Sequence, residues 1–177
     1  MNLSNVLGQL KEKMESNKGL SIFLKNAEKR HKFENWLQVE LCEILAEQYP
    51  DTTVEYEIDI PEDKKKRYAD IFSNNVAIQL KVLIGGKNYK LAGRLAVEIG
   101  IAKEDRGLIP DIKMLKNYEG EKKIIFIVFP AKHNDGPWGK QYRQIVERYV
   151  ELKGGIEFVP KNSSDTGVIY WSDKWLK

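Results

Sequence analysis

Residues 68–82, YADIFSNNVAIQLKV, constrain the fold of this chain more than any other stretch. Two largely apolar runs flank Asn74-Asn75, and asparagine tolerates the positive φ angles of a two-residue hairpin loop. With that loop, the numbers of directly opposed residues sum to 149, so Asp70 faces Gln79. Because side chains repeat every second residue along a strand, Lys81 joins the same face. The sequence therefore predicts a hairpin on which three polar side chains converge.

The remaining patterns predict a mixed α/β fold. Apolar spacing typical of helices occurs in residues 2–16, 20–31, 33–48, 109–118 and 135–155, the last ended by Gly154-Gly155. Patterns typical of strands occur in residues 54–60, where alternation predicts a half-buried strand, and in 122–129, 156–160 and 167–171. The expected core order is helix, three strands, helix, strand, followed by a further helix and a β-rich end.

The length of 177 residues suits one domain with a small extension. We expect an N-terminal helical extension over residues 1–32 and the α/β domain over 33–177. No apolar run approaches the length needed to span a bilayer, and the first residues lack the zones of a signal peptide. The single Cys42 excludes an internal disulfide, so a cytoplasmic location is the default expectation.

One acid falls on the apolar face of the helix predicted over residues 33–48. Glu40 lies inside the apolar stripe of this helix, where a buried carboxylate is costly unless it is paired. The polar face of the hairpin could supply the partner. Glu34 is also close to the stripe, but an acid in a first turn is favoured by the helix dipole alone. The stripe itself consists of Phe33, Leu37, Leu41, Ile44 and Leu45.

Carboxylates, an amide oxygen and a lysine together suit phosphodiester hydrolysis. Mg²⁺ takes oxygen ligands and keeps several waters, and it can polarise a phosphoryl oxygen or activate a water. A nearby lysine can stabilise the developing negative charge. The alternative is a buried structural pair between Asp70 and Lys81, with Gln79 as a hydrogen-bonding neighbour. The strands alone leave both interpretations open.

The net charge of +3 is unevenly distributed. Residues 1–32 hold seven Lys and Arg against three Glu, residues 33–60 hold eight acids and no base, and residues 61–94 hold eight bases against three acids. An acidic block between basic flanks fits a cation site beside a phosphate-binding surface. Solvated faces of helices and strands are the commoner origin of such runs.

The spacing of the polar hairpin residues resembles the PD-(D/E)xK nuclease superfamily. Asp70, eight intervening residues and Gln79-x-Lys81 follow a helix that carries an acid, and the resemblance covers roughly residues 33–130. It implies a restriction-endonuclease-like core and a Mg²⁺-dependent nuclease acting on DNA, with Mn²⁺ as a possible substitute. RNA is not excluded, and a homodimer would suit duplex cleavage.

The resemblance also implies a role for each residue. Asp70 would be the main metal ligand, Gln79 would take the position of the second acid, and Lys81 would be the catalytic lysine. Glu40 would be the helix acid, and the backbone carbonyl of Leu80 would be a further ligand. Two residues depart from the family pattern, because Ala69 replaces proline and Gln79 replaces an acid.

The change at Gln79 removes one negative charge and keeps open a second function, a catalytically weak or inactive nucleic-acid-binding module. Some active branches, such as transposon-end nuclease subunits, tolerate this replacement. A third possibility is a small interaction protein. The bases of residues 64–67 could contact phosphates or pair with acids across the hairpin. The residues expected to contact nucleic acid are Lys64, Lys65, Lys66, Arg67, Lys87, Lys90 and Arg94.

Overall fold

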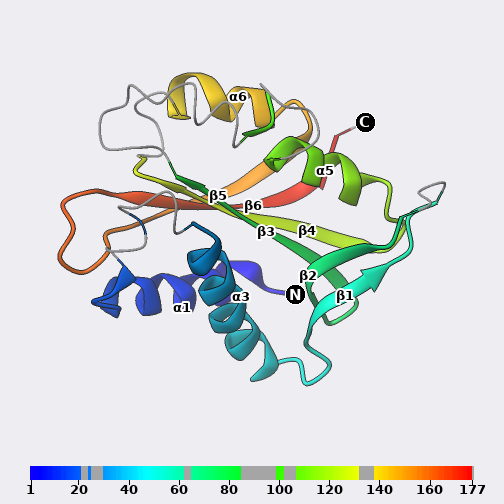
Figure 1. The fold of residues 1–177 in the computed structure, drawn as a ribbon, viewed down its shortest axis with the longest axis horizontal. Helices are drawn as coiled ribbons and strands as arrows, with labels where there is room; N and C mark the ends of the chain where they lie inside the picture. The colour runs from blue at the N-terminus through cyan, green and yellow to red at the C-terminus, as the bar shows by residue number, and fades with distance from the viewer. Residues whose placement is uncertain are drawn as a thin grey trace.

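A computed structural model describes residues 1–20, 24, 30–61, 65–84, 99–101, 107–131 and 138–176. The described strands form one sheet of six, in the order β1-β2-β3-β4-β6-β5, with helices on both of its faces (Figure 1). The mixed α/β class is therefore confirmed. The strands are β1 (Thr53–Ile58), β2 (Arg67–Ser73), β3 (Val76–Ile84), β4 (Glu121–Phe129), β5 (Val150–Phe158) and β6 (Gly167–Trp175). The helices are α1 (Leu3–Ser16), α3 (Arg30–Ala46), α5 (Leu108–Lys116) and α6 (Arg143–Val146), with a π-helical turn over Trp138–Tyr142.

The predicted hairpin is present in the predicted register. Strands β2 and β3 are antiparallel, with Ser73 opposite Val76 and Ile71 opposite Ile78. Asn74 and Asn75 form the loop, and their φ angles of 50° and 60° are the positive values that such a loop requires. The opposition of residues whose numbers sum to 149 is therefore confirmed for the three pairs from Ser73–Val76 to Ile71–Ile78.

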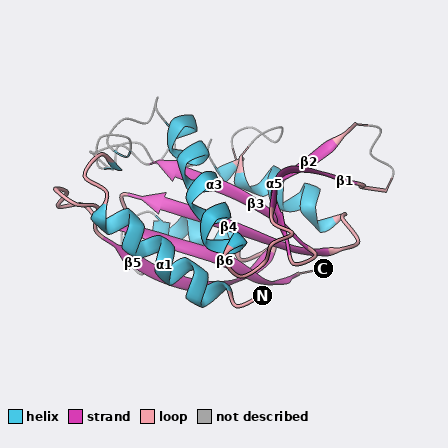
Figure 2. Cartoon of the chain, turned by 90° about the horizontal axis from the view of Figure 1, so that it is seen from below, coloured by secondary structure: helices cyan, strands magenta, loops and turns pink. Residues whose placement is uncertain are grey.

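One face of the sheet is covered by α1 and α3, which both lie across it in Figure 2. The five apolar residues predicted on the α3 stripe are all buried, and they pack with Ile71, Ile78 and Leu80 of the hairpin. Helix α1, expected as an extension, contributes buried side chains to the same core: Leu3, Val6, Leu7, Leu10 and Met14. This layer fixes α3 against β2 and β3.

The opposite face is covered by α5 and α6 (Figure 1). Strand β4 runs parallel to β3 over its whole length, from Val76 opposite Glu121 to Ile84 opposite Phe129. A parallel neighbour needs a crossover connection, and α5 lies within it. The order helix, three strands, helix, strand is as expected, and it places the start of α5 near the hairpin.

Two local expectations are wrong. The helix predicted to reach Gly154-Gly155 ends at Val146, and the chain enters β5 at Val150 because this segment pairs with β6. Gly154 and Gly155 have positive φ angles beside an irregularity in that pairing. The expectation for residues 54–60 is wrong only in part: Ile58 and Ile60 are buried, but Val54 and Tyr56 of the edge strand β1 are 50% and 40% exposed.

Candidate active site at the parting of β2 and β3

The regular backbone pairing of β2 with β3 stops at Ile71 and Ile78. Beyond that point, the side chain of Asp70 accepts the hydrogen bond of a β3 backbone amide. The Oδ2 atom of Asp70 accepts a hydrogen bond from the backbone amide of Leu80 at 2.6 Å. The same atom accepts a second bond from Nε2 of Gln79, also at 2.6 Å. Asp70 and Gln79 are thus brought together as predicted, and both are tied to the backbone of β3.

Helix α3 supplies the other partners of the parted strands. Nε2 of Gln38 donates to the backbone carbonyl of Asp70 at 2.6 Å, and Oε1 of Glu34 accepts from the amide of Val82 at 3.0 Å. Buried backbone groups need partners, and side chains provide them here where the ladder does not. The α3 face therefore stabilises an opening in the hairpin.

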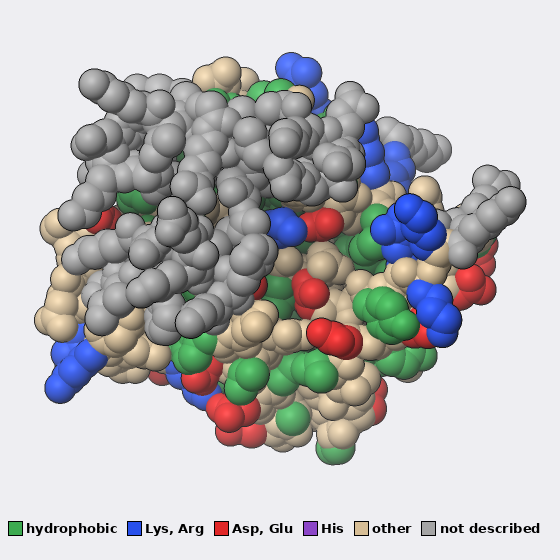
Figure 3. Space-filling model, in the orientation of Figure 1, with side chains coloured by type: hydrophobic (Ala, Val, Ile, Leu, Met, Phe, Trp, Pro, Cys, Tyr) green, Lys and Arg blue, Asp and Glu red, His purple; other side chains and the backbone are tan. Residues whose placement is uncertain are grey.

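This opening forms a pocket with a volume of 160 Å³. Its ionisable lining holds three acids, Glu34, Glu55 and Asp70, against one base, Lys81. In Figure 3, acidic and basic side chains meet near the centre of the face that carries α3 and the hairpin. The remaining lining residues are Asn35, Gln38, Gln79 and Leu80. An excess of carboxylates in a confined space favours a bound cation.

The amide of Gln79 has one unused oxygen. Its nitrogen donates to Asp70, whereas Oε1 is buried and accepts no hydrogen bond from the described residues. A buried acceptor without a partner costs about 1–3 kcal/mol, so such an atom is expected to have a function or a missing partner. Beside the Asp70 carboxylate, Oε1 has the chemistry of a ligand for a hard cation.

Lys81 lines the pocket and pairs with an acid that sequence reasoning missed. Its Nζ lies 2.9 Å from Oδ2 of Asp111, in the first turn of α5. The two side chains are only 21% and 22% exposed, so water screens the pair weakly. The interpretation of a structural pair between Asp70 and Lys81 is therefore wrong, because Asp111 holds the ammonium.

Burial dominates the electrostatics of the two aspartates. It raises the pKa of the Asp70 carboxyl from 3.8 to about 6. The amide of Leu80 and the charge of Lys81 oppose this rise in pKa, while the charges of Asp111 and Glu34 add to it. Burial also raises the pKa of Asp111, against the effect of Lys81. Both shifts reflect carboxylates that lie close together with little water.

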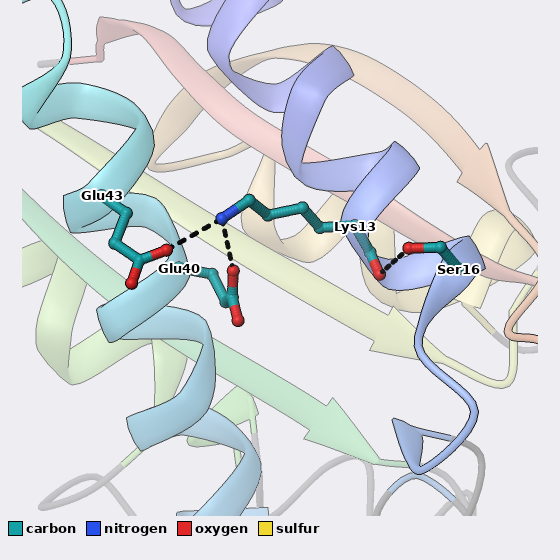
Figure 4. Close-up of polar contacts among 4 residues, drawn as sticks. All are labelled: Lys13, Ser16, Glu40 and Glu43. Atoms are coloured by element: carbon teal, nitrogen blue, oxygen red, sulfur yellow. Dashed lines mark hydrogen bonds and ion pairs between the residues drawn. The ribbon is translucent and has the colours of Figure 1, made fainter.

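Glu40 is not brought to this pocket. Its carboxylate accepts a hydrogen bond from Nζ of Lys13 at 2.6 Å, and the same ammonium donates to Glu43 at 2.9 Å (Figure 4). These contacts join α3 to α1 instead of to the hairpin. The expected position of Glu40 is thus corrected, and Glu34 is the α3 acid at the pocket.

The basic residues expected to contact nucleic acid are described only in part. Nζ of Lys66 lies 2.9 Å from a carboxylate oxygen of Glu57 in β1, and the lysine side chain is 71% exposed. Of the two alternatives, contact with phosphates or pairing with an acid across the hairpin, the pairing is present for this lysine. Lys65 is exposed and Arg67 is half-buried at the start of β2. Lys64, Lys87, Lys90 and Arg94 lie outside the described residues.

Two of the functional residues at this site, Glu34 and Asp111, have signals in the sequence, and a third, Gln38, has none. The helix dipole does not explain Glu34, because α3 begins at Arg30 and places this acid beyond the first turn. Asp111 stands between apolar residues at helical spacing, the criterion applied to Glu40. Gln38 gave no signal, because a glutamine four residues after Glu34 is unremarkable on a helix.

The carboxylates do not form a complete metal cage by themselves. No group of three or more His, Cys, Asp or Glu side chains within the described ranges has the arrangement of a metal site. A cation here would therefore rely on mixed ligands, with Asp70 and the Gln79 amide oxygen as the protein's contribution and water as the rest.

Comparison with family models, curated proteins and solved structures finds no match to this chain. None of the described helices is long and apolar enough to span a membrane. The pocket itself is therefore the basis for assigning a function to this chain.

Proposed function

We propose that this chain is a nuclease of the PD-(D/E)xK type that requires a divalent cation, Mg²⁺ or Mn²⁺, and hydrolyses phosphodiester bonds of DNA. The observation that carries the proposal is the buried Oε1 of Gln79, which has no hydrogen-bond partner among the described residues. It belongs to the amide that bonds to the Asp70 carboxylate, in a pocket that Lys81 also lines. An acidic pocket with a free amide oxygen suits a hard cation, and the neighbouring lysine suits an anionic substrate.

The cation would be held by Asp70 and the amide oxygen of Gln79, with the carbonyl of Leu80 as a further ligand on the pocket wall. When bound, it supplies a Lewis acid that polarises a phosphoryl oxygen and lowers the pKa of a water. Glu34 and Gln38 keep β2 and β3 apart through their bonds to Val82 and Asp70, which would leave room for the cation between the strands.

Hydrolysis adds water across a P–O bond. The water oxygen bonds to phosphorus and the bond from phosphorus to the leaving oxygen breaks. One water proton ends on the leaving oxygen, and the other stays on the new phosphomonoester until it passes to solvent. Negative charge grows on the phosphoryl oxygens during the attack, and the Lys81 ammonium at the pocket wall would stabilise it. Lys81 thereby acts as an electrostatic group, with Asp111 as its resting partner.

A cleavage assay on plasmid and single-stranded DNA tests the proposal, with Mg²⁺, with Mn²⁺ and with EDTA. We expect cutting that requires the cation and falls at least about a hundredfold in Asp70→Ala and in Lys81→Met. Lys113→Ala is the matched control, because Lys113 is an exposed lysine of the same helix as Asp111. Cutting that survives both pocket substitutions would exclude this pocket as the active site.

A second function, DNA binding without cleavage, is favoured by one observation. Gln79 carries no charge, and its nitrogen already bonds to Asp70, so the hairpin contributes one carboxylate fewer than the family pattern. In that case the native chain would bind DNA in a salt-dependent manner but leave it uncut with either cation. Replacing Gln79 by Glu would then be expected to create activity.

A further inference from the structure

Asp70 and Lys81 have opposite charges and line the same pocket. A direct ion pair between them would neutralise both, and it would fill the position that a cation needs. The structure has a different pairing. Asp70 accepts its bonds from Leu80 and Gln79, whereas Lys81 lies 2.9 Å from Asp111. The ammonium is therefore drawn to α5 and away from the parted strands.

Helix α5 is anchored so that Asp111 has little freedom to leave this position. Leu108, Ile112 and Leu115 are fully buried against β3 and β4, on either side of Asp111 in the sequence. Exposed ion pairs contribute little because water and side-chain entropy oppose them. The pair of Lys81 and Asp111 is mostly shielded from water, and its acid is fixed by a packed helix, so it restrains the lysine effectively.

We propose that Asp111 is a positioning residue that holds the Lys81 ammonium on the α5 side and thereby keeps the Asp70 carboxylate open to a cation. This proposal assumes the cation site of the proposed function. Among the described residues, the carboxylates that line the same pocket as Lys81 are available to its ammonium once Asp111 is removed. An ammonium beside them repels a divalent ion at close range.

A double-mutant cycle on Mn²⁺ affinity, measured by isothermal titration calorimetry, tests this role. Asp111→Asn also removes a negative charge, which weakens cation binding at any distance, so the cycle compares its effect in the native chain and in Lys81→Met. We expect a loss of about tenfold or more in the native background and of threefold or less when Lys81 is replaced. Equal losses in the two backgrounds would overturn the proposal.

Asp111→Glu provides the conservative rescue, because it keeps the charge that holds the lysine. Its Mn²⁺ affinity is expected within about threefold of the native value. A loss as large as that of Asp111→Asn would mean that the shape of the side chain matters and its charge does not, which would contradict the proposal.

A second measurement needs neither metal nor activity. Urea unfolding in EDTA gives the coupling between Lys81 and Asp70 from the variants Lys81→Met, Asp70→Asn and their combination. We expect a small deviation from additivity in the urea midpoints of the native background, where Lys81 acts on Asp70 through its charge alone. The deviation should grow once Asp111→Asn is present, because Lys81 then pairs with Asp70. An equal deviation in both backgrounds would overturn the proposal.

These outcomes separate the two proposals. A native chain that binds no Mn²⁺ overturns the cation site, and with it the role of Asp111 in keeping that site open. Mn²⁺ binding without coupling between Asp111 and Lys81 overturns only the role of Asp111 and leaves the proposed function standing.

Discussion

The backbone amide of Leu80 donates a hydrogen bond to the carboxylate of Asp70, and this bond replaces the strand pairing that ends at Ile71 and Ile78. An ionisable side chain thus serves as part of the β-ladder while lining a pocket. Asp70 both joins the two strands and lines the pocket between them, so stability and function are coupled at this residue.

The first prediction concerns this coupling. Burial raises the pKa of Asp70 from 3.8 to about 6, so around pH 5 the folded chain keeps a proton that the unfolded chain has released. Stability from this group is therefore present at low pH and is lost as pH rises through about 6. A shift of about two pH units corresponds to roughly 3 kcal/mol. Asp70→Asn keeps an acceptor for Leu80 without the charge.

We therefore expect Asp70→Asn to be more stable than the native chain by about 1–3 kcal/mol near pH 8, with the difference shrinking toward pH 5. Urea unfolding in EDTA at several pH values measures this. Asp59→Asn is the control, since Asp59 is exposed just beyond β1. A variant that is equally destabilised at every pH would contradict the effect of burial on Asp70.

The second prediction follows from competition between a proton and a cation for Asp70. Because its pKa is about 6, the carboxyl must lose a proton before it can bind a metal at lower pH. The apparent Mn²⁺ affinity should fall by about tenfold per pH unit below about pH 6 and level off above pH 7. Calorimetry across this range checks the expectation. An affinity that stays constant would mean that the ion binds elsewhere.

The third prediction tests the loop that sets the register of the hairpin. Asn75 has a φ of 60° and is exposed, so its side chain contributes through backbone preference and little else. Glycine adopts positive φ freely, whereas a β-branched residue does not. Asn75→Gly should keep the stability of the chain or raise it slightly, and Asn75→Val should lower it by about 1–2 kcal/mol. Denaturant unfolding of both variants distinguishes these outcomes.

Local patterns were enough to predict the hairpin, because loop chemistry and two-residue periodicity fix its register without reference to the rest of the fold. They were also enough for the buried stripe of α3. They failed for residues 147–155, where a helical apolar pattern was overridden by pairing of β5 with β6. The choice between helix and strand there depends on a partner that follows later in the chain.

The site was predictable only where its members share one local element. Asp70 and Gln79 are opposed on one hairpin, so their contact followed from register. The partner of Lys81 could not follow in this way, because Asp111 reaches it through the crossover between β3 and β4. The acid of α3 was misassigned because the helix begins three residues earlier than its pattern indicated.

The last prediction uses the two acids of α3 as a matched pair. Glu34 and Glu40 are six residues apart, so they lie about 9 Å apart along the helix axis and point in different directions. Glu34 bonds to Val82 at the pocket, while Glu40 bonds to Lys13 of α1. Glu34→Gln should weaken Mn²⁺ binding by about three- to tenfold, because it removes a nearby negative charge.

Glu40→Gln should leave Mn²⁺ affinity within about twofold of the native value and cost about 0.5–1 kcal/mol of stability, because the partly exposed contact with Lys13 is lost while Glu43 remains. Calorimetry and urea unfolding on the same two variants give both readouts. The reverse result, with the larger loss of affinity in Glu40→Gln, would restore Glu40 as the helix acid of the site. It would also mean that α3 changes its packing against α1 when the cation binds.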